Sequence, residues 1–157
     1  MRIIFACDHA GFELKEHLKH NVSSWGYDVE DMGAFTYEAQ DDYPDYVAPA
    51  ARAVSEDNLQ QTRAIIIGGT GQGEAIVANR FARVRAVVYA GEPRSSQTNA
   101  PTILMITREH NDANVLSLGA RFLDAQTAEA AVRTWLETPF SNEERHVRRI
   151  QKIESSR

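Results

Sequence analysis

Short apolar runs alternate with longer segments of helical periodicity along this chain. Runs of strand length, most of them rich in branched aliphatic residues, lie at 2–6, 27–31, 64–67, 86–90 and 115–118. The segments between them are too long for hairpin turns and carry apolar residues at helical spacing, so the strands are expected to run parallel. This pattern predicts a doubly wound, Rossmann-like α/β domain with a five-stranded parallel sheet and helices on both faces.

The segments between and after the strands predict six helices. They are expected over 11–25, from Pro44, from Gly73 or Glu74, and over 102–109, 125–137 and 142 to about 153. Proline is tolerated in the first turn of a helix, which explains the second start. Residues beyond 153 are expected to fray. Because no repeat, low-complexity tract or long linker divides residues 1–157, the chain predicts a single domain.

Composition and charge narrow the possible partners. Of the 157 residues 43% are hydrophobic, enough to bury a core without disulfide or metal staples. Lys and Arg number 17 against 22 Asp and Glu, and the net charge of −5 argues against nucleic acid as a partner. Cys7 is the only cysteine, so no internal disulfide can form. No apolar run approaches the roughly 20 residues of a membrane span, and no signal peptide is recognisable, so a cytoplasmic location without membrane contact is expected.

Two polar loops are expected to meet at one edge of the predicted sheet. The first strand leads into Asp8 and His9, and the third leads into 68–74, with the sequence GGTGQGE. Ligands of open parallel sheets bind outside the carboxyl ends of the strands. The glycines allow several amide N–H groups to converge on one anionic oxygen, although a structural tight turn is an equal alternative. The run lacks the ending of a P-loop and of a dinucleotide fingerprint, which argues against a nucleotide.

Several side chains near these loops have both a chemical and a structural interpretation. Glu74 is either a general base or a first-turn carboxylate that complements a helix dipole. Thr70 either passes a proton between oxygens or bonds local backbone. His110 is either a general acid or a solvated capping residue, and Asp8 and His9 are either ligand groups or surface turn residues.

A basic segment near the C-terminus offers a phosphate site. Arg145 and Arg149 lie four residues apart on a predicted helix, a spacing at which two guanidinium groups can hold one phosphate. The alternative is a solvated face paired with Glu143 and Glu144. Arg121, after the fifth strand, is another candidate cation. The scattered histidines and single cysteine have no zinc spacing, so no metal site is predicted.

Several of these motifs occur together in one known family. They are Cys7–Gly11, Asp42–Pro44, 68–74 followed by Ala78–Arg80, Arg108–Asn111 and Arg145–His146. In this order, and over almost the whole chain, the sequence resembles the type B ribose-5-phosphate isomerases. The resemblance implies a doubly wound α/β subunit that forms a homodimer, in some members a tetramer, with active sites shared between chains and with no metal or cofactor. The helix at about 142–153 is expected to contribute to the dimer.

The resemblance also implies a reaction and assigns roles to residues. In this aldose–ketose isomerisation the sugar ring is opened, a proton moves between carbons 1 and 2, and the glycine loop holds an enediolate. Asp8 and His9 would bind the sugar and help open its ring, and His110 would act as the acid. The implied substrate-binding residues are Tyr43, Gly69, Thr70, Gly71, Gln72, Gly73, Asn111, Arg121, Arg145 and Arg149, with amides of the loop on the enediolate oxygen and the arginines on the phosphate. Arg145 and Arg149 would come from one chain and Arg121 from its partner. Thr70 would assist proton movement between oxygens.

Two departures from the family pattern bear on the chemistry. Many members carry a cysteine base where this chain has Gly69, whereas a second branch uses a glutamate that closes the glycine loop, and Glu74 stands there. The base is therefore assigned to Glu74 and not to Cys7. The polar stretch 91–101 is longer than the family's usual connection, which bears on sugar size and subunit contacts.

These observations predict an isomerase that interconverts ribose-5-phosphate and ribulose-5-phosphate. Two alternatives remain open. One is an isomerase of a six-carbon aldose phosphate, because related family members act on allose-6-phosphate or galactose-6-phosphate. The other is a non-catalytic module that binds phosphosugars.

Overall fold

A five-stranded parallel sheet forms the centre of the molecule. The computed structural model describes residues 1–91 and 102–156. Its strands are β1 (Arg2–Cys7), β2 (Asp28–Asp31), β3 (Thr62–Gly68), β4 (Ala86–Tyr89) and β5 (Val115–Gly119). They lie in the order β2-β1-β3-β5-β4, and every pair is parallel. The predicted doubly wound α/β fold is confirmed.

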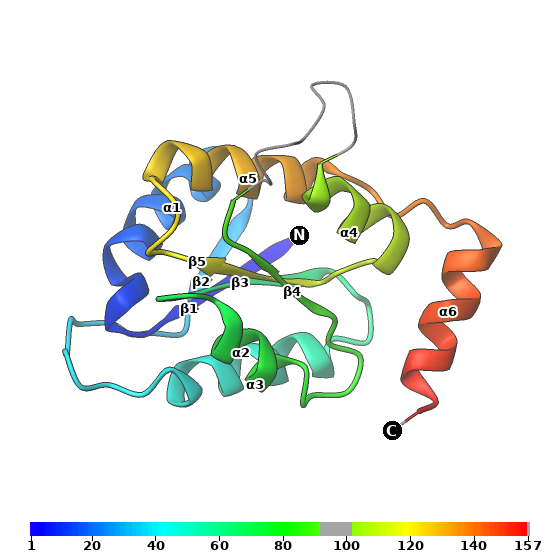
Figure 1. Ribbon diagram of the computed structural model, residues 1–157, viewed down its shortest axis with the longest axis horizontal. Helices are drawn as coiled ribbons and strands as arrows, with labels where there is room; N and C mark the ends of the chain where they lie inside the picture. Colours follow the sequence, from blue (N-terminus) through cyan, green and yellow to red (C-terminus); the bar gives the residue numbers. More distant parts are fainter. Residues whose placement is uncertain (92–101, 157) are drawn as a thin grey trace.

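Helices cover both faces of this sheet (Figure 1). One face carries α1 (Phe12–Ser24), α4 (Ile103–Asn111) and α5 (Ala125–Glu137), and the other carries α2 (Tyr43–Glu56) and α3 (Gln72–Ala78). The last helix, α6 (Glu144–Glu154), stands apart from both layers. Among residues 1–91 and 102–156, none of the helices has the length and apolar character of a membrane span.

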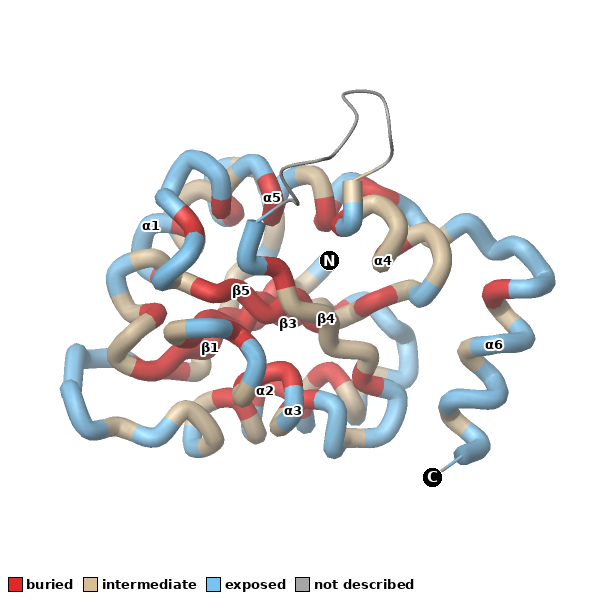
Figure 2. The backbone as a smooth tube through the Cα atoms, viewed as in Figure 1, coloured by how far each residue is buried: buried red, intermediate tan, exposed pale blue. Residues whose placement is uncertain are grey.

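The alternation of side chains along β1 explains why helices are needed on both sides. Ile3 and Phe5 point into a core shared with α1 and α5, whereas Ile4 and Ala6 point into a core shared with α2. Because a parallel strand in the middle of a sheet is buried on both faces, it is an uninterrupted apolar run. Figure 2 shows this burial concentrated in the sheet, with α6 largely exposed.

Element boundaries differ slightly from the predicted ones. β3 begins at Thr62, earlier than predicted, because Thr62 and Arg63 pair with the first residues of β1. A short 3-10 turn, His9–Gly11, precedes α1, because the Asp8 carboxylate accepts a hydrogen bond from the Ala10 N–H at 3.0 Å. The other helices begin within a few residues of their predicted starts, and α6 continues to Glu154. Residues 92–101 of the long polar stretch lie outside the described residues.

The sheet order places the switch point, where doubly wound sheets form a crevice, between β1 and β3. The chain passes from β1 to β2 on one side and then crosses to β3 on the other, so the connections diverge at this point. In doubly wound folds, such a switch point at the carboxyl ends of the strands is where ligands bind. The loops that follow β1 and β3 are therefore the first place to look for chemistry.

Candidate active site

The loops after β1 and β3 are pressed together. Cys7 pairs with Ile67 in the sheet, so Asp8 and Gly68 follow side by side. Gly11 packs so closely on the end of β3 that a Cβ atom there would lie 2.5 Å from the Ile67 carbonyl oxygen. Only glycine allows this approach.

The glycine loop, defined here as residues 68–73, is held against β5 and α2. The Ser117 hydroxyl donates a 2.6 Å hydrogen bond to the carbonyl of Gly71, which has a positive φ of 75° at the start of α3. Tyr43 lies over Gly73, where a Cβ atom would be 2.7 Å from the tyrosine hydroxyl oxygen. Thr70 accepts a 3.3 Å hydrogen bond from the Gln72 N–H. The loop is thus fixed from two sides, a condition for amides that are to hold an anionic oxygen.

Glu74 points back over the loop. Glu74 is only 4% exposed, and a Cβ atom on Gly68 would collide with the Glu74 carboxylate. Burial raises the pKa of Glu74, the negative charge of Asp8 raises it further, and a hydrogen bond with its own backbone N–H opposes both. A carboxylate of raised pKa beside a loop of amides is suited to take a proton from carbon.

Asp8 and His9 face the same crevice, together with a residue that the sequence did not single out. Asp8 is 7% exposed and adds to the negative field around Glu74. His9 is bound by Asp41: one carboxylate oxygen, Oδ1, lies 2.9 Å from the His9 backbone nitrogen and 2.7 Å from its ring Nδ1. The hydrogen bond to Asp41 raises the pKa of His9. Asp41 lies in a polar loop 32 positions from His9, and no local pattern identifies it.

Arg121 supplies a positive charge to this group. Its backbone N–H donates to the Gly69 carbonyl at 3.1 Å, and its side chain lies over Gly69, where a Cβ atom would be 3.0 Å from Nε. The charge of Arg121 lowers the pKa of His9, which opposes the effect of Asp41. The residues that gather at the carboxyl ends of the strands are therefore Asp8, His9, Tyr43, Gly69, Thr70, Gly71, Gln72, Gly73, Glu74 and Arg121.

The surroundings of Cys7 do not favour a nucleophile or a base. It is fully buried within β1, and burial raises the pKa of its thiol to about 11. A thiol of that pKa carries almost no thiolate at neutral pH.

One group of side chains has the donor types of a metal site. Within residues 1–91 and 102–156, Asp8, His9 and Asp41 each offer one atom of a type that can bind a metal ion, and these atoms lie within 4.8 Å of one another. The hydrogen bond between His9 and Asp41 already satisfies two of these atoms. Two members of the group are therefore hydrogen-bonded to each other.

The remaining candidate residues lie at the opposite ends of the strands, the amino ends. His110 and Asn111 end α4 just before β5 begins, whereas Gly68 and Gly119 end their strands. β5 has five residues, which at about 3.3 Å per residue separates its ends by about 13 Å. A single chain thus divides the candidate residues into two groups, one at each end of the strands.

The second group is built from α4 and α6. The ring of His110 packs on that of His146, with centroids 4.2 Å apart, and His146 is buried. The Ser141 hydroxyl donates to the Glu109 carbonyl at 2.7 Å and lies 2.9 Å from His146 Nδ1, which ties the start of α6 to the end of α4. Arg145 is exposed and pairs with Glu143 at 2.8 Å. Arg149 follows one turn later on the same helix.

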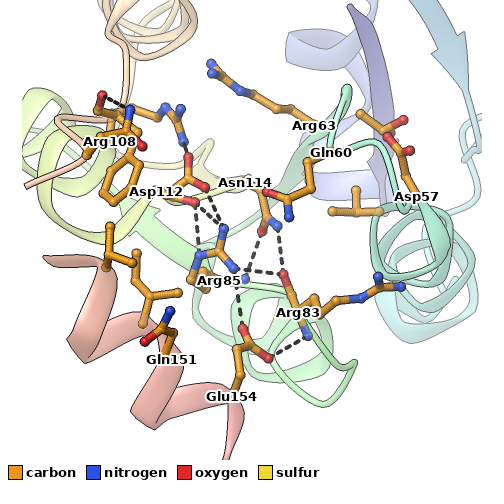
Figure 3. A pocket seen from close by; sticks show the side chains of 16 residues that line it. Asp57, Gln60, Arg63, Arg83, Arg85, Arg108, Asp112, Asn114, Gln151 and Glu154 are labelled. Atoms are coloured by element: carbon orange, nitrogen blue, oxygen red, sulfur yellow. Dashed lines mark hydrogen bonds and ion pairs between the residues drawn. The ribbon is translucent and has the colours of Figure 1, made fainter. Parts of the chain in front are cut away.

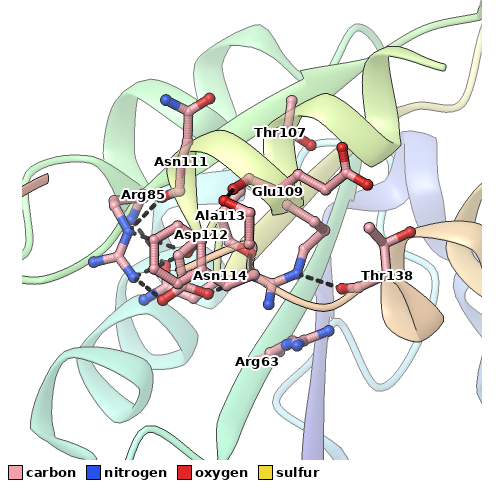
Figure 4. A network of polar contacts seen from close by, with 12 residues as sticks. Arg63, Arg85, Thr107, Glu109, Asn111, Asp112, Ala113, Asn114 and Thr138 are labelled. Carbon is pink, nitrogen blue, oxygen red and sulfur yellow. Dashed lines mark hydrogen bonds and ion pairs between the residues drawn. The ribbon is translucent and has the colours of Figure 1, made fainter. Parts of the chain in front are cut away.

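A polar network fixes the end of α4 (Figure 4). Asp112 has a positive φ of 45° and accepts from Arg108 at 2.8 Å and from Arg85 at 2.9 Å. Arg108 also donates to the carbonyls of Ala113 and Thr138 at 2.7 and 3.2 Å. The only sequence signal for this network is the concentration of polar residues at 108–114. The network ties the residues at the end of α4 to Arg85 and to Thr138.

A cavity of about 380 Å³ lies beside this network, between α6 and the amino edge of the sheet (Figure 3). Arg63, Arg85, Val147 and Ile150 are among the residues that line it. None of the predicted site residues lines it. The candidate site residues therefore lie in the two groups at the ends of the strands, outside this cavity.

Comparison with known proteins shows similarity over almost the whole chain. Residues 3–153 match the family model described as Ribose/Galactose Isomerase. The chain is 38% identical to ribose-5-phosphate isomerase B of Escherichia coli over 152 residues, which is 97% of this chain and 93% of that protein. It is also 38% identical to the Mycolicibacterium paratuberculosis protein of the same name, over 96% of this chain and 87% of that one.

Solved structures give the same result. A crystal structure of ribose-5-phosphate isomerase B from Mycoplasma genitalium with bound ribulose-5-phosphate has a TM-score of 0.88 and 32% identity, covering 99% of this chain and 95% of that one. The sequence motifs, the fold and the full-length matches agree. The chain belongs to the ribose/galactose isomerase family, and within it to the type B ribose-5-phosphate isomerases.

Proposed function

We propose that this protein interconverts ribose-5-phosphate and ribulose-5-phosphate through an enediolate, with Glu74 as the base. The observation that carries the proposal is the buried Glu74 carboxylate lying directly on the glycine loop, where Asp8 and His9 also meet. Family relatives named as ribose-5-phosphate isomerases support the choice of sugar. A six-carbon aldose phosphate is the nearest rival substrate, since the family description includes galactose isomerases.

Each step has a group suited to it. Asp8 and His9 bind the sugar and help open its ring, and the Glu74 carboxylate then takes the proton from carbon 2. Amides of the glycine loop hold the negative oxygen that develops, as in other sites where fixed donors await a charge. Thr70 relays a proton between the two oxygens, and Glu74 returns its proton to carbon 1. Ring opening breaks the bond between carbon 1 and the ring oxygen while the carbon 1 hydroxyl loses a proton and the ring oxygen gains one. The later steps are proton transfers between side chains and sugar.

A second copy of the chain completes the site in this proposal. His110, Asn111, Arg145 and Arg149 lie at the far end of the strands from Glu74, so they serve the Glu74 crevice of a partner subunit. Arg145 and Arg149 then hold the phosphate together with Arg121 of the crevice, and His110 acts as the acid of ring opening. The separation of the two groups within one chain supports this arrangement.

A panel of five- and six-carbon aldose phosphates tests the reaction and its base. Each sugar is incubated with enzyme in deuterated water, and ketose formation and deuterium at carbon 2 of recovered aldose are followed. We expect ribose-5-phosphate to give the highest kcat/KM. Glu74→Gln should lower kcat by roughly 10²–10⁴-fold with little change in sugar-phosphate binding.

The outcomes separate the alternatives. A higher kcat/KM on a six-carbon sugar would replace ribose-5-phosphate as the substrate. Binding without ketose or deuterium exchange would make the protein a phosphosugar-binding module. Unchanged turnover in Glu74→Gln would remove Glu74 from the mechanism.

A further inference from the structure

Asp41 is a buried carboxylate that lies beside the proposed site and has no role in the mechanism above. It stands at the end of the loop between β2 and α2, and its side chain is 5% exposed. The start of that loop is anchored by Lys15, a fully buried residue that binds Asp31 at 2.7 Å and donates to the Ala34 carbonyl at 2.6 Å. A buried carboxylate requires polar partners, and His9 supplies two of them.

The two contacts between Asp41 and His9 fix the imidazole in space. A single oxygen, Oδ1, accepts from the His9 backbone N–H at 2.9 Å and lies 2.7 Å from ring Nδ1. Because an ionised carboxylate only accepts hydrogen bonds, Nδ1 carries a hydrogen. The other ring nitrogen, Nε2, then remains to act on a substrate oxygen. The His9 side chain is 29% exposed, so part of it remains accessible.

The charged groups around His9 come from several elements. Asp8 precedes it in the chain, Asp41 comes from the loop before α2, and Arg121 from the segment after β5. The ring of Tyr37 meets the imidazole edge-on at 6.4 Å. Asp41 and Asp8 raise the pKa of His9, burial and Arg121 lower it, and the hydrogen bond to Asp41 is the largest effect. His9 therefore retains its proton to higher pH than an ordinary histidine.

We infer that Asp41 is a positioning residue that holds the His9 imidazole with Nδ1 protonated and Nε2 directed to the sugar. The inference rests on the proposed function, because it assigns Asp41 a task through the sugar-binding role of His9. Asp41 itself touches neither the sugar nor the reacting carbons. The arrangement resembles the carboxylate–histidine pairs that orient imidazoles in many enzymes.

Titration of the His9 ring tests this inference without any catalysis. The ring signals of His9, assigned by their absence in His9→Asn, are followed by NMR against pH in wild type, Asp41→Asn and Glu38→Gln. Glu38 is exposed and lies in the same loop, so its variant matches the change in charge without the contact. We expect a lower His9 pKa in Asp41→Asn and none of this change in Glu38→Gln.

Kinetics test whether the contact matters for turnover. Asp41→Asn should lower kcat/KM on the best sugar phosphate by about tenfold, through loss of a charge-assisted hydrogen bond, and should move the pH profile in the same direction as the His9 titration. In a His9→Asn background, Asp41→Asn should have little further effect. Asp41→Ala, which also removes the positional contact, should lower kcat/KM at least as far.

The results distinguish failure of this inference from failure of the proposed function. An unchanged His9 titration in Asp41→Asn, or an equal kinetic loss with and without His9, would overturn the positioning role even in an active isomerase. A shifted His9 titration in a protein that turns over no sugar would refute the proposed function and leave the Asp41–His9 contact standing. Thermal unfolding of each variant shows that the folded protein is being measured.

Discussion

At the scale of single residues, the contact between Glu74 and Gly68 determines what the glycine loop can do. The carboxylate occupies the space of a side chain on Gly68, which explains why the first glycine of the loop is needed. The sequence identified both residues but not this contact. A carboxylate in the first turn of a helix normally faces solvent, so its inward direction follows only from the folding of the loop.

We expect Gly68→Ala to move Glu74 without unfolding the protein. The added methyl group would meet the far end of a flexible side chain, which can rotate away. Displacement of a base costs catalysis heavily, so kcat should fall on the order of 10²-fold. Steady-state kinetics and thermal unfolding measure the two effects. Full activity in Gly68→Ala would show that the position of the carboxylate is unimportant.

The pKa of Glu74 also predicts a dependence of stability on pH. Because the pKa is raised in the folded protein, the folded state holds this proton more tightly than the unfolded state does. The stabilisation is complete below the unfolded pKa of about 4.3 and is lost as the pH rises through the folded pKa. Glu74→Gln should therefore unfold at higher urea concentration than wild type at about pH 8, and this advantage should shrink toward pH 4. A constant difference at all pH values would contradict the burial cost.

The contact between Asp41 and His9 could not be predicted from the sequence, unlike the positions of the other site residues. Asp8, His9 and Glu74 stand next to strand ends, and strand ends can be located from hydrophobic runs. Asp41 lies in a loop without periodicity, 32 positions from its partner. A contact of that range depends on how the loop folds back, which no local pattern specifies.

At the scale of elements, the strands were the most predictable part. Each buried strand of this sheet is an apolar run, so its place and its parallel direction follow from the pattern. The starts of β3 and α1 were less predictable, since pairing with β1 extends the strand and the Asp8 cap inserts a 3-10 turn. Both are tertiary or capping effects on a correct local pattern.

The end of α4 depends on one buried arginine. Arg108 is 3% exposed, and its loss would remove one of the two arginine donors to the Asp112 carboxylate and the hydrogen bonds to two backbone carbonyls. Arg108→Ala should lower the free energy of unfolding by about 2–4 kcal/mol, measured by urea denaturation. Arg133 pairs with Glu137 at 3.0 Å with both side chains 60% exposed, so Arg133→Ala should cost less than about 0.5 kcal/mol. Similar losses in both would mean that the network does not hold α4.

At the scale of the whole molecule, the fold could be predicted from the chain alone, but the assembly of the site could not. Glu74 follows β3, whereas His110 precedes β5. Because these two strands are parallel, the two residues lie at opposite ends of the strands. Hydrophobic periodicity contains no information about how a second copy would bridge that distance. The shared site came from the family resemblance and stays a prediction.

Subunit complementation tests the shared site. Glu74→Gln and Arg149→Ala, each of low activity alone, are mixed after unfolding and refolded together. A dimer with one chain of each kind has one site with both defects and one intact site, so about a quarter of all sites should be restored. Arg149→Ala alone should weaken binding of phosphorylated sugars far more than of free sugars, because it removes a charge-assisted phosphate contact. No recovery in verified mixed dimers would show that Glu74 of one chain and Arg149 of the other do not form one site.

The sheet that keeps the two groups of residues apart has a consequence for reaction order. If turnover requires groups from both ends of the strands, an isolated subunit is inert however well it folds. Below the dissociation constant of the dimer, halving the protein concentration would then quarter the rate. In a cell, the onset of catalysis would follow the square of early expression and would begin only after chains have met.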